Sequence, residues 1–132
     1  FRCFLAPLEQ GADVQRVTQL HYREMVEPTG VWQDTVEAEF KPEHRAFARM
    51  LAQEFGLAEP DVDVHRLVFA IFGMGVHFFV GQPVIVQIQP QVLADAAAVE
   101  ELADRLAGYA LGMIAAERRR RRAAAAARGA HR

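Results

Sequence analysis

The sequence contains no serine and no asparagine, and Lys41 is its only lysine. The absence of serine excludes a serine nucleophile. Lys41 does not follow a glycine, so the chain has no P-loop lysine. Cys3 is the only cysteine, so an intrachain disulfide is impossible, and this cysteine usage fits a cytoplasmic location. The first residues lack a long apolar core followed by a cleavage site, so we expect no signal peptide.

Acidic residues dominate most of the chain. Residues 1–117 carry a net charge of −9, whereas residues 118–132 contain seven arginines and no acidic residue. An acidic body argues against nucleic-acid binding by the core of this chain. The low complexity of the last fifteen residues predicts a solvated tail, frayed or helical without partners, although its arginines also suit phosphate groups. We therefore divide the chain into a domain, residues 1–117, and an Arg/Ala-rich C-terminal tail, residues 118–132.

Five histidines and many carboxylates raise the question of a metal centre. Helical di-iron proteins use Glu-x-x-His pairs, but none of these histidines has a glutamate three residues before it. Only His21 and Glu24 show the reverse spacing. We therefore expect no metal site and no cofactor, and we interpret the histidines as structural or pocket residues. The chain also lacks a catalytic triad, a CxxC motif and a GxGxxG motif, so no feature indicates an enzyme.

Apolar residues recur at helical spacing, and no alternating strand pattern with hairpin turns is present, so we predict an all-α bundle of five to six helices. Pro42 should kink a helix or restart it, and Gly56 should end that helix. Asp61 or Asp63 should cap the helix that follows. The expected helical segments are residues 1–9, 14–26, 31–55, a central helix ending between Gly81 and Val86, and residues 94–120.

The central helix contains the longest apolar stretch of the chain. Every residue from 67 to 80 except His77 is apolar or glycine. A helix that is apolar on all sides must be covered on all sides. The stretch is shorter than the roughly 20 residues that cross a bilayer, so we expect no membrane span. We expect its own domain to cover one side of the helix, and a second copy, a ligand or both to cover the other. Gly73 and Gly75 would allow close approach.

His77 is the only polar side chain in that stretch. Two interpretations stay open: a core histidine bonded to a carbonyl group, or a polar group that orients a ligand in an apolar cavity. Aromatic and methionine side chains nearby in the pattern suit such a cavity, although residues of this kind are more often plain core. The predicted ligand-binding residues are His21, Met25, Trp32, Phe40, Phe69, Phe72 and His77.

The last helix has a narrow apolar stripe at alternating spacings of three and four residues. This spacing predicts the seam of a helix–helix contact. Alanine and glycine beside the stripe keep the helix slim and permit close packing. The stripe consists of Val99, Leu102, Leu106, Tyr109 and Met113.

Three segments together resemble the C-terminal ligand-binding and dimerisation domain of TetR-family transcriptional repressors. They are HYREMVEPT, the apolar helix with its internal Gly73, and LADRLAGYALGMI. The resemblance covers roughly residues 1–116. In that family a helix-turn-helix domain precedes this one and contacts DNA, and residues 1–132 do not include it.

The resemblance implies a division of labour among the helices. The last two long helices, about residues 63–86 and 94–120, would pair with their copies in a four-helix homodimer interface that includes the five-residue stripe. The earlier helices would enclose a pocket for a small apolar or aromatic effector, whose binding shifts the DNA-reading domains. Two alternatives remain: a dimerisation or interaction module with a filled core, and a helical metal-binding enzyme.

Overall fold

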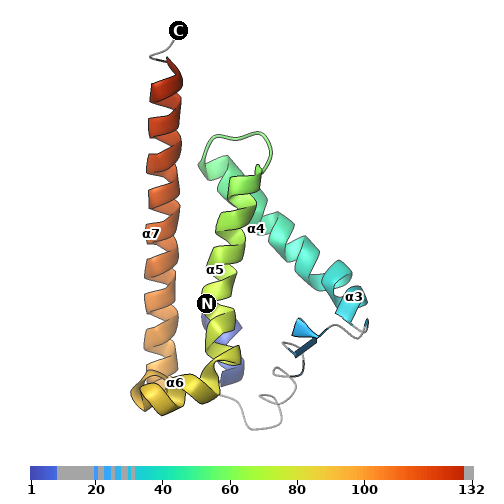
Figure 1. Ribbon diagram of the computed structural model, residues 1–132, viewed down its shortest axis with the longest axis vertical. Helices are drawn as coiled ribbons and strands as arrows, with labels where there is room; N and C mark the ends of the chain where they lie inside the picture. The colour runs from blue at the N-terminus through green and yellow to red at the C-terminus, as the bar shows by residue number, and fades with distance from the viewer. Residues whose placement is uncertain (9–19, 21–22, 25, 28–29, 31, 130–132) are drawn as a thin grey trace.

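The computed structural model describes residues 1–8, 20, 23, 24, 26, 27, 30 and 32–129, and all regular structure in these residues is helical (Figure 1). The all-α prediction is therefore confirmed for this part of the chain. The predicted helix at residues 14–26 lies mostly outside the described residues. The longer helices are α4 (Lys41–Glu54), α5 (Val62–Val80), α6 (Gln82–Ile88) and α7 (Ala96–Gly129). The short turns are α1 (Arg2–Leu5), η1 (Ala6–Leu8), α3 (Trp32–Thr35), the π-helical η2 (Val36–Phe40) and η3 (Pro90–Leu93).

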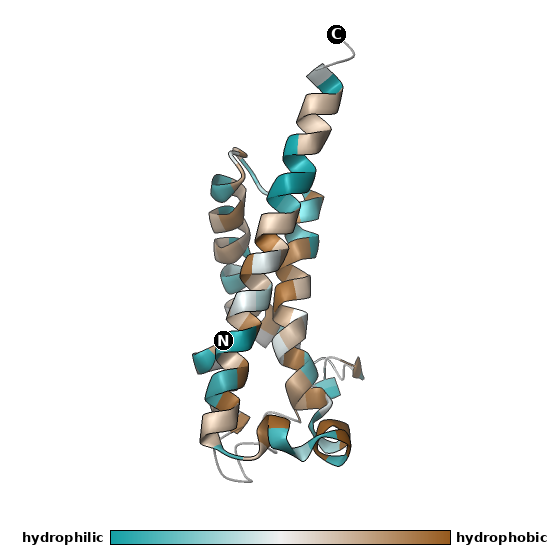
Figure 2. Ribbon diagram, turned by 90° about the vertical axis from the view of Figure 1, so that its left-hand side faces the viewer, coloured by the Kyte–Doolittle hydropathy of each residue, from teal (hydrophilic) through white to brown (hydrophobic). Residues whose placement is uncertain are grey.

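The helices α5 and α7 form an antiparallel pair, joined at one end by α6 and η3 (Figures 1 and 2). The helix α4 meets α5 near the turn between them and diverges from it toward α3 (Figure 1). At the end of the pair where α6 lies, α1 packs on the first turns of α7, and Arg2 pairs with Glu100 at 3.4 Å and with Asp104 at 3.1 Å.

Several helix boundaries lie where local signals in the sequence predict them. The Asp61 carboxylate accepts a hydrogen bond of 3.0 Å from the Val64 N–H and so caps α5. Gly56 has φ +71°, the left-handed conformation that ends α4. Pro42 lies in the first turn of α4, directly after the π-helical η2, so the predicted kink or restart falls where the helix changes type. Gly81 ends α5, and a Cβ there would lie 2.7 Å from the His77 carbonyl oxygen.

Gly81, one of the two ends predicted for the central helix, is confirmed: α5 ends at Val80 with Gly81 as its C-cap residue, and a separate helix, α6, follows. The predicted end of the last helix was wrong. The last helix does not end near residue 120 but continues to Gly129. Alanine and arginine both have high helix propensity, so the tail extends α7 without needing tertiary contacts at each residue.

Two apolar clusters hold the helices together. The first joins α4, α5 and α7, and the second joins α1, η1, α5 and α7. Burial of their apolar surface stabilises the fold by about 25 cal/mol for each Å² removed from water. The first consists of Ala48, Leu51, Val64, Leu67, Val68, Ile71 and Ala110. The second consists of Leu5, Leu8, Phe79, Val99, Ala103 and Leu106.

By length and composition α5 could cross a membrane, since its 19 residues reach a mean hydropathy of 1.4. Core helices of soluble proteins pass the same test, which makes one such helix weak evidence for a membrane span. About a third of the apolar window, 33%, is buried inside the chain. Val62, Phe69 and Val80 are large apolar side chains of α5 that stay exposed in the single chain.

Candidate functional site

An apolar pocket lies where α4 and α5 meet the start of the chain. Phe1, Phe47, Ile71 and Phe72 line it, and its volume is about 310 Å³. The Phe47 and Phe72 rings pack edge to face, with centroids 5.7 Å apart. None of these described lining residues is charged or polar. The pocket therefore offers apolar contacts and aromatic ring edges to a small molecule.

Two larger hollows, each of about 430 Å³, are less suited to an apolar ligand. One lies between the Arg2 segment and the start of α7, and Glu100 lines it. The other lies beside the arginines of α7, where Glu54 and Arg121 line it. An apolar molecule in either hollow would displace water from charged groups, which costs free energy. The smaller apolar pocket is therefore the better candidate.

Of the predicted ligand-binding residues, the structure places Phe72 in this pocket. Phe69 points elsewhere, is 66% exposed and lies against the His44 ring at a centroid distance of 4.5 Å. His77 is also exposed, with its ring edge-on to Phe78 at 5.9 Å. Phe40 is 42% exposed in η2. Three further predicted residues cannot be placed in the pocket: His21 and Met25 lie outside the described residues, and Trp32 has only its helical backbone described.

The outer sides of α5 and of α7 each carry exposed apolar residues, and we call these residues together the α5–α7 face. It contains exposed large apolar side chains and glycines with open space around them. A Cβ added at Gly73, Gly108 or Gly112 would meet nothing within 4 Å. The face consists of Val62, Phe69, Gly73 and Val80 on α5, and of Gly108, Leu111 and Gly112 on α7.

The predicted interface stripe on α7 lies for the most part on the opposite side of that helix. Val99 and Leu106 are buried in the second cluster, with exposed fractions of 4% and 2%. Leu102 and Met113 are partly buried against the two clusters. Only Tyr109, 57% exposed, is open to a partner. The stripe is thus a seam within one chain, and its role between two chains stays a prediction.

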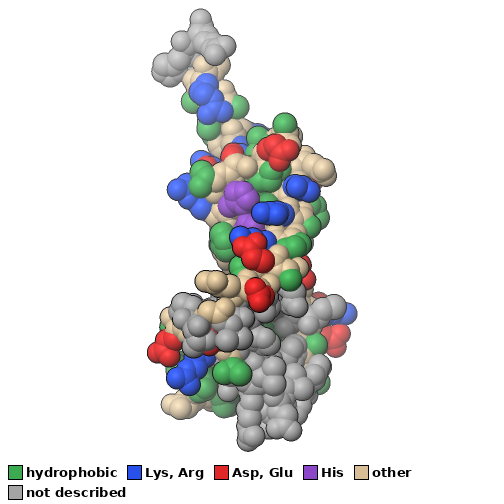
Figure 3. Space-filling view, turned by 90° about the vertical axis from the view of Figure 1, so that its right-hand side faces the viewer, with side chains coloured by type: hydrophobic (Ala, Val, Ile, Leu, Met, Phe, Trp, Pro, Cys, Tyr) green, Lys and Arg blue, Asp and Glu red, His purple; other side chains and the backbone are tan. Residues whose placement is uncertain are grey.

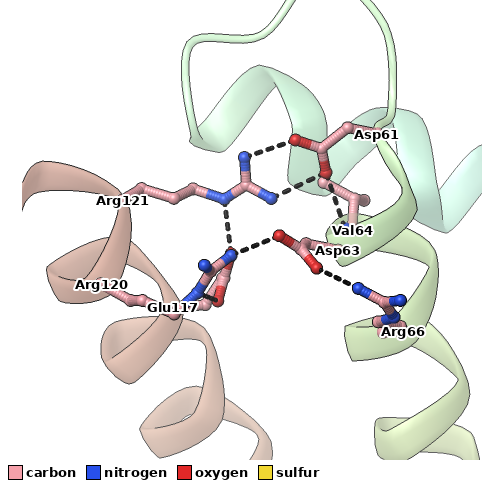
Figure 4. A network of polar contacts seen from close by, with 7 residues as sticks. All are labelled: Asp61, Asp63, Val64, Arg66, Glu117, Arg120 and Arg121. Carbon is pink, nitrogen blue, oxygen red and sulfur yellow. Dashed lines mark hydrogen bonds and ion pairs between the residues drawn. The ribbon is translucent and has the colours of Figure 1, made fainter. Parts of the chain in front are cut away.

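A set of ion pairs, which we call the clamp, ties the arginine run of α7 to the start of α5 (Figure 4). Arg121 donates two hydrogen bonds of 2.8 Å to the Asp61 carboxylate, and Arg120 donates one of 2.6 Å to Asp63. Glu117 lies between the arginines, 2.7 Å from Arg120 Nε and 2.6 Å from Arg121 Nε, the latter without the alignment of a hydrogen bond.

The Arg121 side chain is only 18% exposed, because its guanidinium covers the Phe55 ring at 5.1 Å. Arg118 adds a pair with Glu54 at the end of α4. Figure 2 shows the basic run as a teal band on α7 between paler segments. The expectation of a tail without partners was therefore wrong for Arg118, Arg120 and Arg121. Acidic residues between 54 and 63 were the signal for this contact in the sequence.

The clamp lowers the pKa values of its carboxyl groups. The hydrogen bonds from Arg121 hold the pKa of Asp61 far below its usual value. The bond from Arg120 lowers the pKa of Glu117, and the bonds from Arg66 and then Arg120 lower that of Asp63. These groups bind protons more weakly in the folded chain than in the unfolded chain. Their stabilising effect is therefore full above about pH 4 and is lost as the pH falls toward the folded pKa values.

We expect Arg121→Gln to lower the free energy of unfolding by about 1 kcal/mol at pH 7, because the pairs it breaks are partly exposed. Urea unfolding measures this difference. The gap between wild type and variant should narrow below about pH 4, as Asp61 and Glu117 take up protons. Arg119→Gln is the control, since Arg119 is an exposed neighbour in the same run. Equal losses for both variants at pH 7 would contradict the clamp.

No group of three or more metal-ligating side chains is present among the described residues. A structural or catalytic zinc site needs three or four protein ligands. The described part of the chain therefore gives no support to the alternative of a helical metal-binding enzyme.

Comparison with known families gives one match. Residues 1–116 match the family described as "HTH-type transcriptional dual regulator CecR, C-terminal domain". No curated protein and no solved structure matches the chain. The match ends just before the arginine run that forms the basic half of the clamp.

Proposed function

The chain belongs to the family of CecR C-terminal domains, which are C-terminal domains of TetR-family regulators, and from this premise we propose that it binds a small apolar effector and holds two copies of the regulator together. The family is named for the C-terminal domain of a transcriptional regulator, which supports a regulatory and not an enzymatic role. The observation that supports effector binding most directly is the uncharged aromatic pocket between α4 and α5.

The proposed effector is an uncharged molecule of about two fused rings or less. The pocket volume of about 310 Å³ lies at the lower end of the range for ligand sites. Phe47 and Phe72 offer ring edges and faces, which favour an aromatic guest. A charged effector would lose its hydration there without gaining a partner among the described lining residues. The other predicted ligand-binding residues, in particular His21, Met25 and Trp32, remain part of the proposal.

The position of Phe1 suggests how effector binding could change the affinity of the DNA-binding domain for DNA. Phe1 lines the pocket and packs on both apolar clusters. In the TetR resemblance, the DNA-binding domain connects through the segment at the start of this domain. An effector that separates Phe47 from Phe72 would therefore shift the base of that connection. Packed helices respond by moving as units, and a coupling free energy of about 1–3 kcal/mol changes DNA affinity by 5- to 150-fold.

The proposed homodimer uses the α5–α7 face. Exposed apolar patches of this kind are uncommon on monomers and mark contact surfaces. The glycines Gly73, Gly108 and Gly112 would let the backbones of two copies approach closely. In this arrangement the helices of the two copies form a four-helix bundle in the cytoplasm, and Tyr109 lies at its edge.

Small uncharged aromatic probes such as indole and 1-naphthol should stabilise the chain. At a concentration about 100 times the Kd, a bound probe adds about 2–3 kcal/mol to the free energy of unfolding, seen as a raised Tm. Phe72→Ala should weaken binding of the same probe by about tenfold or more, because the ring that lines the pocket is lost. The control is Met50→Ala on α4, where Met50 is 53% exposed and outside the pocket.

A chain that dimerises but gives no shift with either probe, or equal affinity in both variants, would contradict effector binding in this pocket. The result would favour the second candidate, a dimerisation module without a ligand. The modest size of the pocket is the observation on that side.

A further inference from the structure

Two histidines from different helices face each other beside the apolar core. His44 lies on α4 and His65 on α5, with 2.9 Å between Nε2 of His44 and Nδ1 of His65. Their rings are within 7° of parallel, and their centroids are 5.1 Å apart. With the two nitrogens this close and the centroids that far apart, the rings meet nitrogen to nitrogen and not face to face. Figure 3 shows histidine side chains on the surface that faces the viewer on the α4 side.

Both nitrogens of this contact are placed for a shared cation. One nitrogen now donates its N–H and the other accepts with its lone pair. Partial burial lowers the pKa of His44, and His65 lowers it further. His44 is therefore held more firmly in the neutral form, which is the form that binds a metal ion.

We propose that His44 and His65 bind one divalent transition-metal ion, with Nε2 of His44 and Nδ1 of His65 as its protein ligands. For the ion to bind, the ring that donates the hydrogen bond must first change to its other neutral tautomer, with the proton on the nitrogen that faces away from the contact. Both contacting nitrogens then present lone pairs. The proton moves between the two nitrogens of that ring through solvent, so no net proton is released. Small rotations of the rings turn both lone pairs toward one ion at about 2.0–2.1 Å.

The chemistry of the site selects among metals. Imidazole nitrogens suit Cu²⁺, Ni²⁺ and Zn²⁺, whereas Mg²⁺ and Ca²⁺ require oxygen ligands. Within the described residues no third histidine, cysteine or carboxylate joins the pair, so water completes the coordination. With imidazole ligands, Cu²⁺ should bind most tightly of the three ions. Phe69 packs on the His44 ring at 4.5 Å and restricts its movement.

The site is separate from the proposed effector pocket. His44 and His65 join α4 to α5 near the turn between these helices, and neither lines that pocket. A metal ion would replace one hydrogen bond by two coordination bonds and fix these helices together more firmly. The metal site therefore does not depend on the proposed function.

The test is calorimetric titration of the full chain with CuCl₂ and with ZnCl₂. We expect wild type to bind one Cu²⁺ at this site, and His44→Gln and His65→Gln each to weaken that binding by about tenfold or more. His131→Gln is the control, because it removes a histidine elsewhere in the chain. The electron paramagnetic resonance spectrum of the Cu²⁺ complex should show coupling to two nitrogens in wild type and to one in either variant.

Circular dichroism of the variants shows whether they fold. If one variant fails to fold, the nitrogen coupling in the spectrum of folded wild type still tests the site. Equal Cu²⁺ affinity in wild type and in a double variant that carries both His44→Gln and His65→Gln would overturn the proposal. A wild-type spectrum without two coupled nitrogens would also overturn it.

Discussion

Leucine at both Gly108 and Gly112 should weaken the proposed dimer without loss of helix. Both glycines lie on the outer side of α7, and an added Cβ meets nothing within 4 Å in the single chain. Within one chain the substitutions therefore favour the helix, since leucine has a higher helix propensity than glycine by about 0.8 kcal/mol per residue. Between two chains, bulky side chains at these positions keep the backbones apart. We expect dimerisation to weaken by at least about thirtyfold, the equivalent of about 2 kcal/mol.

Light scattering over a range of concentrations measures this change, and circular dichroism measures the helix content. Gly129→Leu is the matched control, because Gly129 is also an α7 glycine with open space around it but lies far from the α5–α7 face. A double variant that dimerises as tightly as the control would remove Gly108 and Gly112 from the proposed interface.

Leu51→Ala should cost about 2–5 kcal/mol of the free energy of unfolding. Leu51 is 2% exposed and belongs to the cluster that joins α4, α5 and α7. Truncation removes buried methyl groups and leaves a cavity that the packed helices cannot fully close. For a chain of this size the change lowers the Tm by several degrees, and urea unfolding gives its magnitude.

Met50→Ala is the control for Leu51, since Met50 is the neighbouring residue on α4 but is 53% exposed. An exposed truncation of this kind usually changes stability by about 0.5 kcal/mol or less. Similar losses for the two variants would mean that α4 does not pack on α5 and α7 through Leu51.

Helix boundaries were predictable wherever a local rule sets them. Asp61 caps α5, Gly56 ends α4, and Pro42 begins it, because each depends on the conformation or hydrogen bonding of one or two residues. The end of the central helix was harder to place. Gly81 and Val86 were both predicted as possible ends. The structure confirms Gly81, where a glycine and the nearby Pro83 separate α5 from α6.

Helical periodicity identified apolar faces but not their partners. The stripe containing Val99 and Leu106 was predicted correctly as a seam, yet in the structure it packs against α1 and α5 of the same chain. Gly112 was predicted to keep α7 slim beside the stripe; together with Gly108 it lies on the outer side of the helix, where an added Cβ meets nothing within 4 Å. A repeat of three and four residues carries no information about which chain supplies the other half of the contact.

The candidate site was only partly predictable for the same reason. Phe72 was predicted and lines the pocket, whereas Phe47 and Phe1 were missed, because their contribution depends on how α4 and the start of the chain pack on α5. His44 and His65 are 21 positions apart in the sequence, and no sequence motif indicates that their side chains meet. Phe69 was grouped with Phe72 as an aromatic residue of one helix, but the three-residue offset turns it outward.

The mass of the chain in solution tests the central claim, that a second copy covers the α5–α7 face. We expect sedimentation equilibrium at about 10–100 μM, a range in which a dimer with a micromolar or lower Kd is populated, to give twice the chain mass of 14.8 kDa. A folded, helical chain that stays at 14.8 kDa throughout this range would contradict the account.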